Sequence, residues 1–149
     1  MSFNVMSHPG CMLLEIPAGV FENICTYLTG VYPEEGCGLL LGTKSRNRHC
    51  VKFAKPLKNV DPSPKTRFSM DPASIFDVFR YAEDEGLTVL GIFHSHPEGS
   101  PRPSRYDLKT PWRGYIHLII TTMPATHGGY AAWFFTRRGK IIRTNVTLT

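Results

Sequence analysis

Two histidines separated by one residue, His94 and His96, are followed by a loop rich in proline and glycine and then by Ser104 and Asp107. Imidazole nitrogens and carboxylate oxygens are both ligands that zinc accepts in proteins. Two imidazoles with one carboxylate leave a fourth position open, which is the arrangement of a catalytic zinc site. Such a site binds water and lowers its pKa to about 7, so this stretch is a candidate hydrolytic centre.

Each part of the pattern also has a purely structural interpretation. His94 and His96 can simply end a strand, while Ser104 and Asp107 match the start of a helix, where serine accepts from the first backbone amides. In a strand, side chains two residues apart lie on one face, so both histidines can reach the same ion. The prolines and the glycine in the loop let the chain turn back toward the strand end. These residues alone leave both interpretations open.

A hydrolytic zinc site also needs a carboxylate that takes a proton from water and passes it to the leaving amine. Glu98 is close to the histidines, but a glutamate in a loop of proline and glycine is more often solvated. Glu34 and Glu35 directly precede the apolar segment 37–43, where rigid structure would hold a carboxylate and partly desolvate it. The spacing alone does not select one of the three.

The elements that would position these residues are a mixture of strands and helices. Periodicity and capping signals predict helices over 18–30, with Pro17 in the first turn, over 71–86, with Asp71 as N-cap, and a short one over 104–110. Apolar or alternating segments predict strands at 11–16, 37–43, 49–57, 67–70, 87–93, 115–122, 128–136 and 140–148. The order indicates a mixed α/β fold without internal repeats.

The composition is that of a globular protein, with 149 residues of which 42% are hydrophobic and 19% charged. The length fits a single domain over residues 1–149. No apolar run approaches the roughly 18 to 20 residues of a transmembrane helix, and the first residues lack the features of a signal peptide. We therefore expect a cytoplasmic protein without a membrane partner. Because no C-x-x-C pair is present, we expect buried reduced thiols at Cys11, Cys25, Cys37 and Cys50.

The net charge of +5 is unevenly distributed along the chain. Residues 101–149 carry eight Lys and Arg against the single acid Asp107. A basic face can bind nucleic acid, but no helix-turn-helix, RNA-recognition or basic–aromatic pattern is present. We expect this face to be solvated or to attract an acidic protein or a chain-terminal carboxylate.

The spacing resembles the signature of one family, the JAMM or MPN+ zinc metallopeptidases. That signature is an upstream glutamate, then His-x-His, seven residues, Ser, two residues and Asp, and 94–107 matches it without a gap. Upstream, residues 33–38 (PEEGCG) resemble the Pro-x-Glu-x-Cys-Gly of the family, which selects Glu35 over Glu34. The stretches FSMDP, VLGIFHSHP and WRGY are similar to the short single-domain prokaryotic members, and the likeness runs from about residue 11 to 143.

The resemblance implies a fold and a role for each matching residue. The fold would be a single mixed β-sheet, partly barrel-like and flanked by helices, similar to the architecture of cytidine deaminases. His94, His96 and Asp107 would bind one zinc ion, with Glu35 as general base and then acid. Ser104 would help to stabilise the oxyanion. Further residues would orient ligands or border the substrate groove: Ser95, Pro97, Cys37, Tyr106, Trp112 and the loop 59–68.

The resemblance also implies a reaction, the hydrolysis of the amide bond after the C-terminal Gly-Gly of a ubiquitin-like protein. The partner would be a small β-grasp protein, either a sulfur carrier or a ubiquitin-like modifier, so the activity would be deubiquitinase-like. Two alternatives are a RadC-like DNA-associated protein and a non-catalytic MPN scaffold; scaffold members lose metal ligands, whereas all are present here. A zinc deaminase would need the P-C-x-x-C ligands that this sequence lacks.

Overall fold

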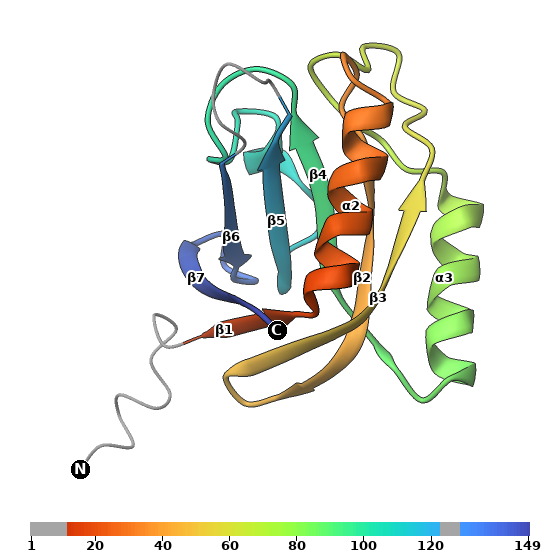
Figure 1. Ribbon diagram of the computed structural model, residues 1–149, viewed down its shortest axis with the longest axis vertical. Coiled ribbons are helices and arrows are strands. Elements are labelled where there is room, and N and C mark those ends of the chain that lie inside the picture. Colours follow the sequence, from red (N-terminus) through yellow and green to blue (C-terminus); the bar gives the residue numbers. More distant parts are fainter. Residues whose placement is uncertain (1–11, 123–128) are drawn as a thin grey trace.

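The computed structural model describes residues 12–122 and 129–149, and within them seven strands close into a barrel. The strand order around the barrel is β1-β3-β2-β4-β5-β6-β7 (Figure 1). The strands are β1 (Leu13–Ile16), β2 (Cys37–Ser45), β3 (Arg48–Leu57), β4 (Thr88–His96), β5 (Tyr115–Thr121), β6 (Tyr130–Phe135) and β7 (Ile141–Leu148). The helices are α2 (Ala18–Gly30) and α3 (Pro72–Asp84), with a 3-10 turn, η2 (Asp107–Lys109). This confirms the expected mixed α/β fold with a barrel-like sheet.

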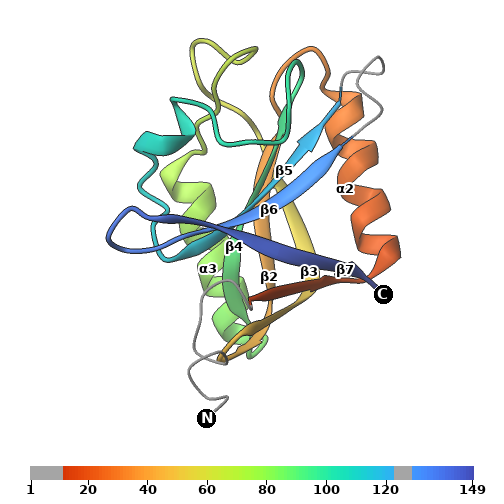
Figure 2. The same ribbon diagram turned by 90° about the vertical axis from the view of Figure 1, so that its left-hand side faces the viewer.

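Two helices pack against opposite faces of the central strands, as Figure 2 shows for α2 and α3 on either side of β2 and β3. Ile24 and Leu28 of α2 are buried in one cluster with Leu40 of β2 and Phe93 of β4. A second cluster joins α3 to the other face of the same strands through Leu39, Leu41, Val78, Ala82 and Ile92. β2 and β4 are therefore buried on both faces where the clusters meet, which explains their continuous apolar sequences.

The register of β2 against β4 brings two distant parts of the sequence together. Cys37 at the start of β2 pairs with His94 near the end of β4, in antiparallel orientation. The segment before β2, which carries Glu35, therefore lies beside the histidine end of β4. β4 and β5 are parallel, and the connection between them, which contains Ser104 and Asp107, returns over the same end of the barrel (Figure 1).

Two predicted elements are wrong. Residues 67–70 are not a strand, because their backbone bonds go to their own loop: the Val60 N–H donates to the Ser69 carbonyl at 2.9 Å. Residues 104–110 do not form a helix beyond the turn η2. Thr110 is extended, with ψ 145°, and it precedes Pro111, whose ring disfavours a helical conformation in the residue before it.

The other predicted elements are present, with shifted ends. β4 is longer than predicted and includes both histidines. α3 begins as predicted, since the Asp71 carboxylate accepts from the Ser74 N–H at 3.1 Å. No helix in the two described stretches is long and apolar enough to cross a bilayer. Cys37 is a buried free thiol and Cys25 and Cys50 are half-buried free thiols, while Cys11 lies outside the described residues.

Candidate active site

The three expected ligands meet at one buried point. Asp107 Oδ2 lies 3.2 Å from His94 Nε2 and 3.1 Å from His96 Nε2, and the two Nε2 atoms are 3.3 Å apart. His94 is 0% exposed, and His96 and Asp107 are each 7% exposed. The ligand atoms of these three residues all lie within 4.8 Å of one another, which is close enough for them to bind one metal ion. His94 and His96, together with Asp107, which follows His96 by 11 residues, thus present three ligand atoms to one centre.

Local bonds fix the orientation of each donor. The His96 Nδ1–H donates to the Ser100 carbonyl at 2.8 Å, which directs Nε2 toward the centre. Ser104 and Asp107 bond reciprocally: the Ser104 N–H donates to Asp107 Oδ2 at 2.8 Å, and the Asp107 N–H donates to Ser104 Oγ at 3.1 Å. This is the predicted capping-box pattern on a single 3-10 turn. It holds the carboxylate against the histidines.

The donor set fits a tetrahedral zinc ion. Ligands at 2.0–2.1 Å from a tetrahedral zinc are separated by about 3.4 Å, close to the three observed spacings. When two unprotonated ring nitrogens face each other at this distance, neither lone pair has a partner unless a cation or a proton lies between them. One bound cation satisfies all three donors at once.

The electrostatics favour two of the three protonation states that a metal requires, an ionised Asp107 and a neutral His94, and oppose the third, a neutral His96. Burial lowers the pKa of His94, so its ring is neutral at neutral pH. Burial alone would raise the pKa of Asp107, but the nearby charge of His94 and hydrogen bonds from both histidines hold this pKa well below its usual value. Burial opposes protonation of His96, yet its hydrogen bonds to Asp107 and to the Ser100 carbonyl raise its pKa. An ionised carboxylate and a neutral imidazole are ready to coordinate.

Glu35 lies at the same end of the barrel, where it is 6% exposed and feels the charges of His96 and Asp107. Burial raises the pKa of Glu35 to about 8, with His96 acting in the opposite direction. Its Oε1 atom is buried and has no hydrogen-bond partner within residues 12–122 and 129–149. The other two candidate glutamates, Glu34 and Glu98, are exposed. Glu35 is therefore the glutamate whose environment can tune a carboxylate for proton transfer near neutral pH.

The residues expected to orient ligands lie around this centre. The Ser95 Oγ accepts from the Gly36 N–H at 2.8 Å, which ties the Glu35 segment to β4. Pro97 is buried directly after β4. The Cys37 thiol is buried and donates to the Leu57 carbonyl at 3.5 Å. Because burial raises its pKa to about 12, Cys37 remains a neutral thiol and packs rather than reacts.

A pocket of about 370 Å³ opens beside Asp107. Tyr106 and Trp112 line it, as the sequence suggested, together with Phe68, Met70 and other residues of the neighbouring loop. Its floor is largely apolar, while Arg67 and Lys109 bring positive charge to it. The pocket is large enough to accept a side chain or a short extended peptide.

Four residues that contribute to the site were not predicted individually from the sequence. Phe68 stacks on the His94 ring with centroids 4.5 Å apart, and Ser100 supplies the carbonyl that orients His96. His117 is buried, and its Nε2–H donates to the Trp112 carbonyl at 2.9 Å. Asn59 bonds to the backbone of Glu35. The one sequence signal is for Asn59, since asparagine in a loop rich in proline and serine is typical of Asx turns.

A family model described as prokaryotic homologs of the JAB domain matches residues 17–136. The chain belongs to this family. The match covers most of the chain, including the Glu35 segment, both histidines, Ser104 and Asp107. It confirms the resemblance to JAMM and MPN+ proteins that the spacing of these residues indicated.

Two proteins that are similar to this chain have names that describe an activity. A "Probable TtuB-protein conjugate cleaving protease" of Thermus thermophilus is 38% identical over 103 residues, which cover 68% of this chain and 66% of the relative. A "Desampylase" of Haloferax volcanii is 35% identical over 90 residues, covering 60% of this chain and 63% of the relative. The chain thus spans just under two thirds of the length of each.

The fold is also shared with a solved structure. The solution structure of a Desulfitobacterium hafniense protein matches with a TM-score of 0.81 and 28% identity, over 91% of this chain and 92% of that one. The match extends over nearly the whole of both chains. A protein with 28% sequence identity therefore shares this fold along nearly its whole length.

Proposed function

We propose that this JAB-family chain is a zinc-dependent peptidase or isopeptidase that hydrolyses the amide bond after the C-terminal Gly-Gly of a ubiquitin-like or sulfur-carrier protein. The observation that carries the proposal is the convergence of three buried ligand atoms within 4.8 Å of one another. Near them lies Glu35, which feels the charges of His96 and Asp107 and whose buried Oε1 has no hydrogen-bond partner among the described residues. The activities named for the two similar proteases support the same reaction class.

His94, His96 and Asp107 would hold the zinc ion through Nε2, Nε2 and Oδ2. A zinc ion with an open position polarises a carbonyl oxygen and acidifies water to a pKa of about 7. The bonds from Ser100 to His96 and from Ser104 to Asp107 would keep these ligands oriented when substrate approaches.

Glu35 would take the proton from the attacking water and deliver it to the leaving amine. A base works best when its pKa lies near the working pH, and burial moves that of Glu35 to about 8. The buried Oε1 atom has no hydrogen-bond partner among the described residues, so no protein group there competes for the proton that it would accept. Glu34 and Glu98 are exposed to solvent instead.

Ser104 would stabilise the negative charge that develops on the substrate carbonyl oxygen. Its Oγ accepts from the Asp107 N–H, which uses a lone pair of the hydroxyl and leaves the O–H free to donate. A donor fixed before the reaction needs no reorganisation in the transition state. The bond to Asp107 thus both fixes Ser104 and links it to the ligand set.

The substrate would lie over the pocket beside Asp107. Tyr106 and Trp112 would border the chain that leads to the scissile bond. Arg67 at the pocket is paired with Asp61, 3.5 Å away, so the positive charge offered to an acidic protein or a chain-terminal carboxylate comes mainly from Lys109. The partner we propose is therefore a small β-grasp protein rather than nucleic acid or a membrane.

A cleavage assay on three substrates tests the function. They are a sulfur carrier with residues appended after Gly-Gly, a carrier joined to cysteine, and a ubiquitin-like protein joined to a lysine side chain. We expect at least one to be cut after the second glycine, with loss of turnover in a zinc chelator and recovery when zinc is returned. Absence of cleavage in all three by zinc-loaded protein would reject the function.

A further inference from the structure

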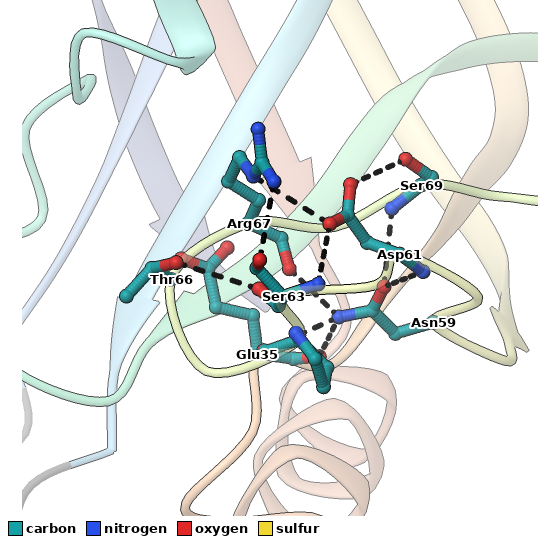
Figure 3. A network of polar contacts seen from close by, with 8 residues as sticks. Glu35, Asn59, Asp61, Ser63, Thr66, Arg67 and Ser69 are labelled. Carbon is teal, nitrogen blue, oxygen red and sulfur yellow. Dashed lines mark hydrogen bonds and ion pairs between the residues drawn. The ribbon is translucent and has the colours of Figure 1, made fainter.

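The loop between β3 and α3, residues 58–70, is organised by the side-chain amide of Asn59 (Figure 3). Asn59 Oδ1 accepts from the Asp61 N–H at 3.0 Å and from the Ser69 N–H at 3.1 Å, so it closes the loop on itself. Asn59 Nδ2 faces carbonyl oxygens, with Arg67 O at 2.9 Å and Pro64 O at 3.4 Å. Oδ1 of the amide therefore closes the loop, and Nδ2 donates to backbone carbonyl oxygens.

The third carbonyl that Asn59 reaches belongs to Glu35. Asn59 Nδ2 donates to the Glu35 carbonyl at 2.9 Å, and the Glu35 N–H donates to the Pro64 carbonyl at 2.7 Å. Both backbone polar groups of Glu35 are therefore bonded to this loop, and Asn59 contacts the loop carbonyl that receives the second bond. Figure 3 shows the Glu35 side chain leading away from the Asn59 amide.

The position of the Glu35 carboxyl depends on this backbone attachment. In the part of the chain that the structure describes, its Oε1 atom has no hydrogen-bond partner, so no group there fixes the side chain through that oxygen. The next residue, Gly36, is held independently, because its N–H donates to Ser95 Oγ and its carbonyl accepts from the Ser95 N–H at 3.0 Å. The backbone around Glu35 is thus bonded to β4 through Gly36 and to the loop 58–70 through Glu35 itself.

The same loop also contacts the metal-ligand set and the pocket. Phe68 stacks on the ring of His94, and residues 67–70 form one wall of the pocket beside Asp107. A change in the loop is therefore transmitted to Glu35, to a ligand and to the pocket wall together. The segment that the sequence identified only as a loop joins the parts of the site.

We propose that Asn59 is a positioning residue for the general base: its amide bonds hold the Glu35 backbone so that the carboxyl reaches the water-binding side of the site. The proposal rests on the proposed function for its catalytic consequence, but the positional part does not. A displacement of about 1 Å of a catalytic group can reduce turnover by about 100-fold.

The positional part is tested by amide hydrogen exchange in Asn59→Ala and Asn59→Asp. Asn59→Asp keeps the acceptor for Asp61 and Ser69 but replaces the donor to Glu35 by an oxygen. We expect the Glu35 amide to exchange at least about 10-fold faster in both variants, because its bond to Pro64 loosens. The Gly36 amide, held by Ser95, is the internal reference and should change less than about threefold. Unchanged protection of Glu35 overturns the proposal.

The catalytic part is tested by kcat, KM and zinc content of the same proteins. We expect kcat per bound zinc to fall about 10- to 100-fold while zinc per chain stays constant. Ser74→Ala is the control outside the loop, since it removes the bond from Ser74 Oγ to the Asp71 carboxylate at the start of α3, and it should retain full turnover. A parallel loss of zinc and turnover in both Asn59 variants, or an equal loss in Ser74→Ala, indicates a general structural role and overturns the proposal. If the wild-type protein cleaves nothing, the proposed function fails, while the exchange result still decides the role of Asn59.

Discussion

Replacement of Glu35 by glutamine separates metal binding from proton transfer. Glutamine has the shape of the glutamate side chain, so the backbone bonds of residue 35 to Asn59 and Pro64 are retained. It cannot accept and return a proton. Since a positioned general base contributes roughly 10²- to 10⁴-fold, we expect kcat to fall by that factor, or about 3–5 kcal/mol of barrier, with zinc content unchanged.

The same substitution has a calculable effect on the metal-free protein. Burial raises the pKa of Glu35 from its ordinary value of 4.5 to about 8. At 1.36 kcal/mol per unit, ionised Glu35 costs the folded state about 5 kcal/mol at most, and relaxation toward water reduces this figure. The folded pKa is the higher one, so the cost is absent below pH 4.5, grows between pH 4.5 and 8, and is complete above pH 8.

Urea unfolding in the presence of a chelator measures this effect at pH 5 and pH 9. Glu35→Gln should have nearly the stability of the wild type at pH 5 and should be more stable by about 3–5 kcal/mol at pH 9. Turnover assays on zinc-loaded protein complete the comparison. Unchanged turnover refutes the role of Glu35 as base, and a stability difference that does not grow with pH refutes the assignment of a buried carboxyl.

Two further substitutions test other parts of the account. Ser104→Ala removes one oxyanion donor and should lower kcat about 10²- to 10³-fold without loss of zinc, as measured by steady-state kinetics and metal analysis; a change below twofold contradicts this role. His49 lies away from the site, where burial lowers its pKa to about 4, so its stabilising effect is complete above pH 6.5 and is lost as the pH falls from 6.5 to 4. His49→Phe should remove up to about 3 kcal/mol of the acid-induced loss in urea unfolding, and an unaltered pH profile would contradict it.

The sequence could predict that His94, His96 and Asp107 lie together because their arrangement is local. His94 and His96 share a face by the two-residue period of β4, and Ser104 with Asp107 forms a reciprocal bond over three residues. Glu35 was selected by the family resemblance, since its distance from the histidines in sequence carries no geometric information. Its proximity comes from the antiparallel pairing of Cys37 with His94.

Two elements and one role escaped sequence reasoning for reasons of tertiary structure. Residues 67–70 have strand-like composition, but Ser69 bonds to Asn59 and Val60 in its own loop instead of to a neighbouring strand. Residues 104–110 begin like a helix, yet Pro111 ends it after one turn. The contact between Asn59 and Glu35 spans 24 residues and depends on the folded loop, so no local pattern signals it.

Zinc analysis of the purified protein and of a His94→Ala, His96→Ala double variant tests the central claim most directly. The account predicts about one zinc per chain in the wild type, consistent with one site of three protein ligands, and loss of that zinc in the double variant. A wild-type protein that binds no stoichiometric zinc, or a double variant that retains it, would contradict the account.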